Sequence, residues 1–296
     1  MNKPVTLFIM TEKGLISLRT IVDNGLKHAI DFIIVGRDKN VLKDYAKEII
    51  ELAETEQITW VERNDQYSVV SKYAVAISWR WLITVKKSAT KLIVLHDSLL
   101  PKYRGFAPLV NQLINKEPFV GVTALFASSE FDRGDIIFQE KRKINYPIKI
   151  EAVITIVSKI YCRLLIKIFK IIISNSDLPS LVQDEKKASY SLWRDEKDYR
   201  IDWSKDADYL ERFINSVGFP YAGASCMMDN MLIRITDVEQ VDDVKIMNRD
   251  YGKILFINNG YPVIVCGKGL LMLKLAFFDQ SNKHVIPLNK FRIRFT

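Results

Sequence analysis

The stretch from Lys91 to Gly105 reads Lys-Leu-Ile-Val-Leu-His-Asp-Ser-Leu-Leu-Pro-Lys-Tyr-Arg-Gly, and it decides how the rest of the chain is interpreted. Its first five residues form an apolar run with the length and composition of a short buried strand. His96 then stands where the strand ends and a loop marked by Ser98 and Pro101 begins. Open α/β sheets place their chemistry at this edge, outside the carboxyl ends of parallel strands. The sequence therefore predicts a functional loop at His96.

A carboxylate downstream completes a candidate proton-transfer pair. The loop is followed by Gly-Val-Thr at 121–123 and by Asp-Arg-Gly-Asp at 132–135. A histidine exchanges protons near neutral pH, and a carboxylate that orients the ring makes it an effective general base. Asp132 is the candidate for that carboxylate. One histidine and one aspartate 36 positions apart (132 − 96) are weak support by themselves, because a lone histidine is more often structural than catalytic.

The complete string resembles the signature of the formyltetrahydrofolate-dependent formyltransferases. The matching parts are His-x-Ser-Leu-Leu-Pro-x-Tyr-Arg-Gly, Ala107-Pro108, Gly-Val-Thr and Asp-x-Gly-Asp, at a His-to-Asp spacing that fits the family. Downstream, Arg-Ile-Asp-Trp at 200–203 resembles the segment where such chains cross to a second domain. Residues 219–224 resemble the Pro-aromatic-x-Gly-Ala turn of sugar N-formyltransferases and methionyl-tRNA formyltransferases. The resemblance covers roughly the whole chain and is strongest around the loop.

The resemblance implies an enzyme that transfers a formyl group to a primary amine. The implied donor is N10-formyltetrahydrofolate, or a 5- or 10-formyl folate analogue, and no metal is implied. His96 would accept the proton of the attacking amine, and Asp132 would orient the imidazole and stabilise its charged form. Four loop residues are interpreted as substrate contacts or loop-shaping residues: Ser98, Lys102, Tyr103 and Arg104. A buried ion pair is the alternative for the arginine.

Position 94 departs from the family pattern. The family's active-site trio is Asn, His and Asp, with the Asn two residues before the His, and this chain has Val94 there. An asparagine amide can donate to a developing oxyanion, whereas valine cannot, and losing one such donor typically costs on the order of 3 kcal/mol. We expect a nearby amide to substitute, with Asn111 or Gln112 on the following helix as candidates. The alternative is a folate- or nucleotide-binding module without turnover, which the retention of both His96 and Asp132 disfavours.

Two tryptophans follow another buried strand, expected at 73–77. Residues 78–82 read Ser-Trp-Arg-Trp-Leu, and indoles at the exit of a strand make a suitable wall for a flat heteroaromatic ring. In the family that the chain resembles, this loop helps to hold the pterin. Simple packing of large aromatic side chains is the alternative, above all for Trp81. The residues assigned to the cofactor are therefore Trp79, Arg80, Trp81, Leu82 and Asp132.

Strands and helices alternate through the first part of the chain. Strands are expected at 5–10, 31–35, 73–77, 91–95 and 121–126, with edge strands at 136–138 and 141–144. Helices are expected at 14–24, 40–53, 106–115 and 151–174. This alternation predicts an α/β fold with a Rossmann-like, mostly parallel sheet and helices on both faces. The last helix carries four cationic residues at intervals of three and four, so it is interpreted as an amphipathic helix and not as a membrane span. No Gly-x-Gly-x-x-Gly follows the first strand, which disfavours a dinucleotide cofactor.

The end of the chain is predicted to form a small, β-rich, OB-like domain. A helix from residue 206 leads to a turn at 218–223, and strands are expected at 232–235, 253–257, 262–265 and 270–276. The predicted boundaries are a formyltransferase-type Rossmann-like domain at 1–182, a polar linker at 183–205 and the C-terminal domain at 206–296.

Composition and charge fit an enzyme that handles anionic molecules. The chain has 296 residues, of which 48% are hydrophobic and 26% charged, and its formal net charge is +8. Because the basic residues are dispersed, charge alone does not choose among nucleic acid, a nucleotide diphosphate and the anionic tail of a folate. Three cysteines without metal-ligand spacing, and a start that leads straight into a strand, predict a cytoplasmic protein without a membrane partner.

The amine acceptor is the least determined part of the prediction. Residues 219–224 look closer to the sugar branch of the family than to the methionyl-tRNA branch, and no basic insertion of the kind expected for the tRNA branch is evident. The favoured substrate is a dideoxy amino sugar on UDP or dTDP, as used in surface polysaccharide or pseudaminic-acid-type pathways. Methionyl-tRNA is the second candidate. The oligomeric state is left open, with a homodimer as one option.

Overall fold

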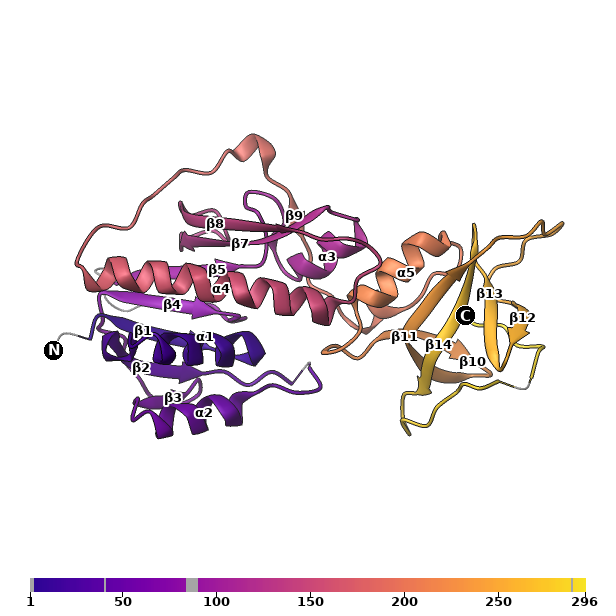
Figure 1. The fold of residues 1–296 in the computed structure, drawn as a ribbon, viewed down its shortest axis with the longest axis horizontal. Coiled ribbons are helices and arrows are strands. Elements are labelled where there is room, and N and C mark those ends of the chain that lie inside the picture. The colour runs from indigo at the N-terminus through magenta and orange to yellow at the C-terminus, as the bar shows by residue number, and fades with distance from the viewer. Residues whose placement is uncertain (1–2, 40, 84–89, 289) are drawn as a thin grey trace. The chain divides into compact units, whose positions relative to one another are not determined.

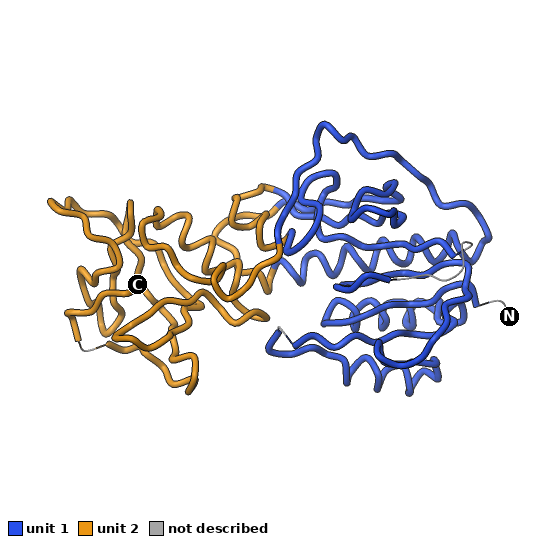
Figure 2. Tube along the Cα trace, turned by 180° about the vertical axis from the view of Figure 1, so that it is seen from behind, with its two compact units in different colours: residues 1–108, 119–143, 153–192 blue, residues 109–118, 144–152, 193–296 orange. Residues whose placement is uncertain are grey.

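The computed structural model describes residues 3–39, 41–83, 90–288 and 290–296. They form two compact units, which Figure 2 shows in different colours. The first unit contains residues 1–108, 119–143 and 153–192, and the second contains residues 109–118, 144–152 and 193–296. Each unit has its own sheet and its own buried core. The predicted boundaries at 182 and 206 stay a prediction.

A seven-stranded sheet forms the centre of the first unit (Figure 1), in the order β3-β2-β1-β4-β5-β7-β8. The first five strands in this order are parallel, and β7 and β8 continue the sheet in antiparallel pairs. The predicted mostly parallel sheet is therefore confirmed, and the two predicted edge segments form one edge strand, β8. The bounds are Val5–Ile9 (β1), Ile30–Val35 (β2), Trp60–Glu62 (β3), Tyr73–Ile77 (β4), Lys91–His96 (β5), Phe119–Phe126 (β7) and Ile136–Lys143 (β8).

Helices α1 (Thr11–Asp23), α2 (Ala46–Thr55) and α4 (Ile150–Ile173) lie on one face of this sheet (Figure 1). Helices α1 and α4 touch where Thr20 Oγ1 donates a hydrogen bond to Cys162 Sγ at 3.0 Å. Although α4 has 24 residues, no helix in the described part of the chain is long and apolar enough to cross a bilayer.

Helix α2 (Ala46–Thr55) begins later than the sequence predicts. Tyr45 has a left-handed backbone, with φ of +61°, which a continuing helix cannot contain. Asp44 Oδ1 accepts a hydrogen bond from the Ala46 amide at 3.1 Å and so satisfies one free donor of the first turn. The predicted start at residue 40 lies outside the described residues.

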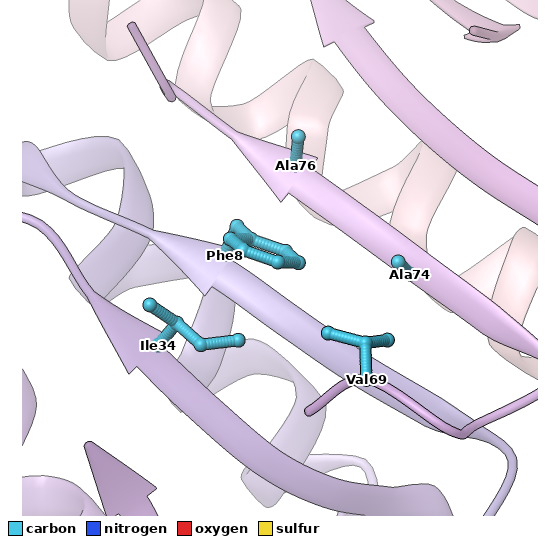
Figure 3. Packing of buried hydrophobic residues seen from close by; sticks show 5 residues of the cluster. All are labelled: Phe8, Ile34, Val69, Ala74 and Ala76. Carbon is cyan, nitrogen blue, oxygen red and sulfur yellow. The ribbon is translucent and has the colours of Figure 1, made fainter. Parts of the chain in front are cut away.

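The opposite face of the sheet carries a compact hydrophobic cluster (Figure 3). Its buried members are Phe8, Ile34, Val69, Ala74 and Ala76. Val69 belongs to the irregular segment 63–72 between β3 and β4, so this face is covered there by loop chain. Trp79 and Val94 pack against the cluster as half-buried neighbours. The face with this cluster ends at the edge of the sheet where the candidate site lies.

The second unit contains a five-stranded antiparallel sheet in the order β10-β11-β14-β13-β12, as predicted for a β-rich C-terminal domain. Strand β10 was not predicted from the sequence, because it lacks a pattern of β-branched residues. It forms a strand because it pairs with β11. The bounds are Ala224–Met228 (β10), Met231–Val241 (β11), Ile254–Asn258 (β12), Tyr261–Val265 (β13) and Leu270–Phe278 (β14). The helices are α3 (Pro108–Ile114), whose residues from Leu109 on belong to this unit, and α5 (Ala207–Ser216).

Short elements complete the chain. Strands β6 (Arg104–Gly105) and β9 (Tyr190–Ser191) pair in parallel, so part of the predicted linker lies beside the candidate site loop. Single turns of 3₁₀ helix occur at Lys27–Ala29, Glu185–Lys187 and Glu196–Tyr199.

Candidate active site

The carboxyl ends of β1, β4 and β5 meet at one edge of the sheet. The strand order reverses between β1 and β4, because the chain continues from β1 to β2 on one side and from β4 to β5 on the other. Such a reversal is the usual place for a ligand in an open α/β sheet. Thr11 Oγ1 donates to Ser78 Oγ at 2.9 Å across this point. His96 is the last residue of β5 and therefore stands at the same edge.

The imidazole of His96 faces the carboxylate of Asp132. Its Nδ1 lies 3.5 Å from Asp132 Oδ1, and the two side chains are 8% and 13% exposed. Its Nε2 lies 2.8 Å from the Tyr103 carbonyl oxygen. Because a carbonyl oxygen only accepts, Nε2 carries a proton, and in the neutral ring Nδ1 has the free lone pair. Nδ1 is therefore the basic nitrogen, and a proton taken up there is stabilised by the carboxylate beside it.

Backbone contacts fix the position of Asp132. Its φ of +57° is left-handed, and its Oδ2 accepts a hydrogen bond from the Gly105 amide at 2.8 Å. The Gln183 amide donates to the carbonyl oxygens of Asp132 and Gly134, both at 2.7 Å. A Cβ at Gly134 would collide with the Phe126 carbonyl oxygen, so the Asp-x-Gly spacing is a steric requirement of this turn. Sequence reasoning missed Gln183, because a single amide in a polar segment carries no periodic signal.

Arg104 forms an ion pair with Glu185 through its buried guanidinium, which is the second of the two roles that the sequence suggested. Its side chain is 0% exposed and forms a two-point contact with Glu185, with N···O distances of 2.7 and 2.8 Å. It also donates to Gln183 Oε1 at 2.8 Å. Hydrogen bonding to the guanidinium lowers the pKa of Glu185 from 4.5 to about 2. This cluster attaches the chain around residue 185 to the site loop.

Most of the other loop residues shape the turn after β5. Ser98 Oγ donates to the Lys102 carbonyl oxygen at 2.6 Å, and the Ser98 carbonyl accepts from Thr123 Oγ1 at 2.7 Å. Tyr103 has a left-handed backbone, which turns its carbonyl oxygen toward His96. The Lys102 side chain is exposed, and among the described residues no carboxylate lies within ion-pair distance of its ammonium. Lys102 therefore keeps its charge available for a ligand.

The two predicted wall residues, Trp79 and Trp81, pack edge to face with ring centroids 5.1 Å apart. They lie over Gly36, where a Cβ would be 2.9 and 2.7 Å from the two indoles, so only glycine allows this approach. Arg63 covers the Trp81 ring at 4.4 Å. Trp79 Nε1 is buried and has no hydrogen-bond partner in the part of the chain that the structure describes. It is a free donor on the face of the sheet that also carries Val94.

The remaining members of the predicted wall have different surroundings. Arg80 forms an ion pair with the buried Asp38 at 2.6 Å, and Leu82 is exposed to solvent. Arg80 therefore closes the loop onto the segment after β2, and Leu82 lies at its outer end.

Val94 faces the same side of β5 as His96, because side chains two residues apart in a strand share a face. It pairs with Ala76 on β4 and Leu125 on β7 and is half-buried. Neither neighbour offers a side-chain donor at this position. The strand thus supplies an imidazole at 96 but no amide at 94.

The two amides considered as substitutes lie on α3. Asn111 Oδ1 accepts a hydrogen bond from Arg194 at 2.9 Å, and the Gln112 side chain is buried. Both residues belong to the second unit, whereas His96 and Asp132 belong to the first. The substitution of Val94 by one of these amides stays a prediction.

A second charged cluster lies behind the histidine, on the helix-covered face. Tyr161 Oη donates to Asp97 Oδ1 at 2.7 Å and lies 2.9 Å from the Leu95 carbonyl oxygen, and Lys13 pairs with Asp97. Burial raises the pKa of Tyr161 well above its ordinary value, and the Asp97 carboxylate acts in the same direction. The cluster anchors the end of β5 to both α1 and α4. No sequence motif indicated it.

The described side chains form no metal-binding cluster. Within residues 3–39, 41–83, 90–288 and 290–296, no group of three or more His, Cys, Asp or Glu side chains is placed to hold a metal ion. The groups that the site does offer are the imidazole, the carboxylate and the indoles.

Two parts of the chain match one protein family. Residues 40–162 match the family described as formyl transferase, and residues 194–287 match the formyl transferase C-terminal domain. The two stretches together span more than half of the chain, and the first contains both His96 and Asp132.

Curated relatives point to the same family. A methionyl-tRNA formyltransferase of Syntrophomonas wolfei is 26% identical over 261 residues, which cover 87% of this chain and 81% of that protein. Another, from Halothermothrix orenii, is 33% identical over 147 residues, or 50% of this chain and 46% of that protein. The matched part of this chain thus spans about half the length of the second relative.

Solved structures share the fold. WlaRD, a sugar 3N-formyl transferase solved in the presence of dTDP and 5-N-formyl-THF, has a TM-score of 0.68 at 19% identity, covering 98% of this chain and 99% of that one. An N-formyltransferase from Helicobacter canadensis, in complex with folinic acid and dTDP-3-aminofucose, has a TM-score of 0.67 at 18% identity, covering 92% and 98%. The methionyl-tRNA formyltransferase from Clostridium thermocellum has a TM-score of 0.54 at 16% identity, covering 81% and 94%.

Proposed function

The chain belongs to the formyltransferase family, and from this premise we propose that it transfers a formyl group from N10-formyltetrahydrofolate to the amine of a nucleotide-linked amino sugar. One observation carries the chemistry of the proposal. His96 Nδ1 lies 3.5 Å from Asp132 Oδ1, while Nε2 is held by the Tyr103 carbonyl oxygen. A base with one defined free nitrogen and a neighbouring carboxylate is what amine acylation requires.

In this proposal His96 removes a proton from the acceptor amine. The amine must be neutral to attack the formyl carbon, and the nitrogen becomes cationic when the new C–N bond forms. His96 Nδ1 takes the proton from that nitrogen and returns it to the leaving nitrogen when the old C–N bond breaks, so no net proton is consumed. General acid–base catalysis of this kind contributes roughly 10²- to 10⁴-fold in rate.

Asp132 stabilises the protonated imidazole and keeps the ring in place. Its Oδ1 faces Nδ1, and its Oδ2 is occupied by the Gly105 amide, so the carboxylate has little freedom to turn away. In a catalytic triad the carboxylate holds the ring nitrogen opposite the basic one, whereas here the Tyr103 carbonyl oxygen holds Nε2 and Asp132 faces the basic Nδ1; in both arrangements the carboxylate stabilises the charged imidazole. Gln183 supports this arrangement through the Asp132 backbone and is a positioning residue.

The residues at the tryptophan wall suit a folate. A bound formyl folate supplies an activated formyl group. Trp79 and Trp81 offer half-buried aromatic surface to a flat ring, and the Trp79 Nε1, which has no partner within the described residues, is a donor for a ring that carries acceptors. Arg80 and Leu82 complete the wall in this proposal. Asp132 is assigned to the cofactor as well, because in this proposal the formyl group reacts beside the imidazole that Asp132 faces.

The nucleotide amino sugar is favoured over other amines by two observations. The turn at 219–224 looks closer to the sugar branch, and two solved structures of the same fold are enzymes described with dTDP or a dTDP amino sugar. Lys102, which no carboxylate of the described chain neutralises, offers a cation for a diphosphate on the site loop. Methionyl-tRNA is the second candidate, because the curated relatives named above carry that activity.

An intact-mass assay tests the proposal. The chain is incubated with N10-formyltetrahydrofolate and either dTDP- or UDP-linked amino sugars or methionyl-tRNA, and each acceptor is inspected for the gain of one formyl group. We expect the gain on a nucleotide amino sugar, and at least about a 100-fold loss of rate in His96→Gln and in Asp132→Asn. Formylation of methionyl-tRNA alone would replace the substrate assignment. Folate binding without formylation of any amine would favour the binding-module alternative.

A further inference from the structure

Two phenylalanines form an exposed aromatic pair beside the candidate active site. Phe106 and Phe131 have ring centroids 6.0 Å apart and planes inclined at 54°, and their residues are 46% and 65% exposed. Apolar rings of this size normally lie in the core of a domain, so two of them in contact on the surface require a reason. Phe106 and Phe131 together are called the Phe pair.

The Phe pair is attached directly to the catalytic loops. Phe106 follows Gly105, whose amide donates to Asp132, and Phe131 immediately precedes Asp132. The Phe106 amide donates in turn to the Ser191 carbonyl oxygen at 3.0 Å, which fixes the backbone under the ring. The carboxylate of Asp132 turns toward His96, whereas the neighbouring Phe131 ring is largely in solvent. The pair therefore forms the outer rim of the loops that carry the acid–base groups.

We propose that the Phe pair is a stacking site for the pyrimidine base of the nucleotide-linked substrate. This inference rests on the proposed function, because it assumes that the acceptor is a nucleotide sugar. The amine of such a substrate has to reach His96, so the base, at the far end of the molecule, lies outside the reaction centre. A planar base that stacks on the Phe pair removes from water both its own aromatic face and the exposed phenylalanine rings. Lys102, four residues before Phe106 on the same loop, is available for the intervening diphosphate.

Charge favours this occupant over an apolar one. The chain carries a formal net charge of +8, and an aromatic surface on the loop that also carries the Lys102 ammonium matches a ligand that combines a ring with phosphates. The aminobenzoyl ring of the folate is the competing occupant, since it is also planar. The two occupants are separated by measuring each ligand on its own.

Calorimetric titration of the full chain with dTDP, UDP and inorganic pyrophosphate tests the inference. Phe106→Ala and Phe131→Ala should each raise the Kd of dTDP and UDP by about 5- to 150-fold, the range for losing one stacked aromatic partner. Pyrophosphate has no base, so its Kd should not change. The KM of the nucleotide amino sugar should rise in parallel, while kcat at saturation and the KM of the folate stay the same. Phe131→Tyr keeps a ring and should bind dTDP as the unchanged chain does.

Phe119→Ala is the matched control, because Phe119 is an exposed phenylalanine, 37% accessible, at the start of β7 in the same unit. It should leave all Kd values unchanged. Equal weakening of dTDP and pyrophosphate, an unchanged Kd of dTDP in the double alanine variant, or a rise in the KM of the folate alone would each overturn the assignment. If the unchanged chain formylates a nucleotide amino sugar and the Phe variants bind dTDP normally, only this inference fails. If no nucleotide amino sugar is formylated, the proposed function fails, whatever the Phe variants bind.

Discussion

Replacing Val94 by Asn tests the departure of this site from the family pattern, in which an asparagine stands two residues before the histidine. Val94 shares a face of β5 with His96 and is flanked in the sheet by Ala76 and Leu125, none of which donates a side-chain hydrogen bond there. Val94→Asn would place an amide donor on the strand that ends in the proposed base. We expect this variant to turn over faster than the unchanged chain, because the amide can stabilise charge that develops on the formyl oxygen.

The size of the effect follows from two opposing terms. One well-aimed oxyanion donor is worth about 2.7–4 kcal/mol, so kcat can rise by roughly 10²- to 10³-fold. Against this, the half-buried Val94 loses its packing on the Phe8 cluster, at about 0.8 kcal/mol for each buried methyl, and a polar amide is placed there at a cost of roughly 1–3 kcal/mol. A total loss near 3 kcal/mol in the free energy of unfolding is tolerable for a domain with an ordinary stability of about 5–15 kcal/mol.

The assay compares kcat under saturating substrates with urea unfolding for three chains: unchanged, Val94→Asn and Val94→Ala. The alanine variant removes the same packing without adding a donor, so it should lose stability and gain no rate. Asn111→Ala and Gln112→Ala, each made both in the unchanged chain and in the Val94→Asn variant, form double-mutant cycles. If one of these amides substitutes for the missing donor, its removal lowers kcat more in the chain that keeps Val94.

One result would refute the reasoning. A folded Val94→Asn chain whose kcat does not exceed that of Val94→Ala would show that position 94 has no access to the developing charge. If Asn111→Ala and Gln112→Ala also left turnover unchanged, the substitute-amide hypothesis would fall with it.

Three further predictions concern the surroundings of the site. Gly36→Ala pushes a Cβ into both indoles, so the KM of the formyl folate should rise by about tenfold or more with kcat largely retained, as measured by initial rates. Arg104 lowers the pKa of Glu185 in the folded chain from 4.5 to about 2. The ionised Glu185 therefore stabilises the fold fully above pH 4.5, and this stabilisation is lost as the pH falls toward 2. The melting temperature of Glu185→Gln should depend less on pH across this window than that of the unchanged chain. Tyr161→Phe removes the hydrogen bond from Tyr161 Oη to Asp97 Oδ1, while Lys13 stays paired with the same carboxylate, and should lower the free energy of unfolding by about 1–3 kcal/mol in urea titrations, whereas an unchanged midpoint would contradict the anchoring role given to this cluster.

The amino-acid sequence determined the local elements and the identity of the proposed chemistry. Apolar runs with turn residues around them predicted strands at 5–10, 73–77 and 91–95, because burial on a sheet demands such runs, and the structure has strands at Val5–Ile9, Tyr73–Ile77 and Lys91–His96. The loop motif after 91–95 singled out His96 and Asp132, since a motif with fixed spacing is a property of sequence alone. The departure at position 94, where this chain has valine and the family pattern has asparagine, was visible from the sequence in the same way.

Only the tertiary structure decided how distant residues act together. Gln183 holds the Asp132 loop from 51 positions away, and Arg104 pairs with Glu185 across 81 positions. Periodicity and composition report the environment of neighbouring residues, whereas such contacts depend on how β6 and β9 come side by side. The basic nitrogen of His96 was likewise settled by a backbone oxygen, that of Tyr103, whose direction comes from a left-handed turn. Because every residue has a backbone carbonyl, the type of residue at position 103 could not predict this contact.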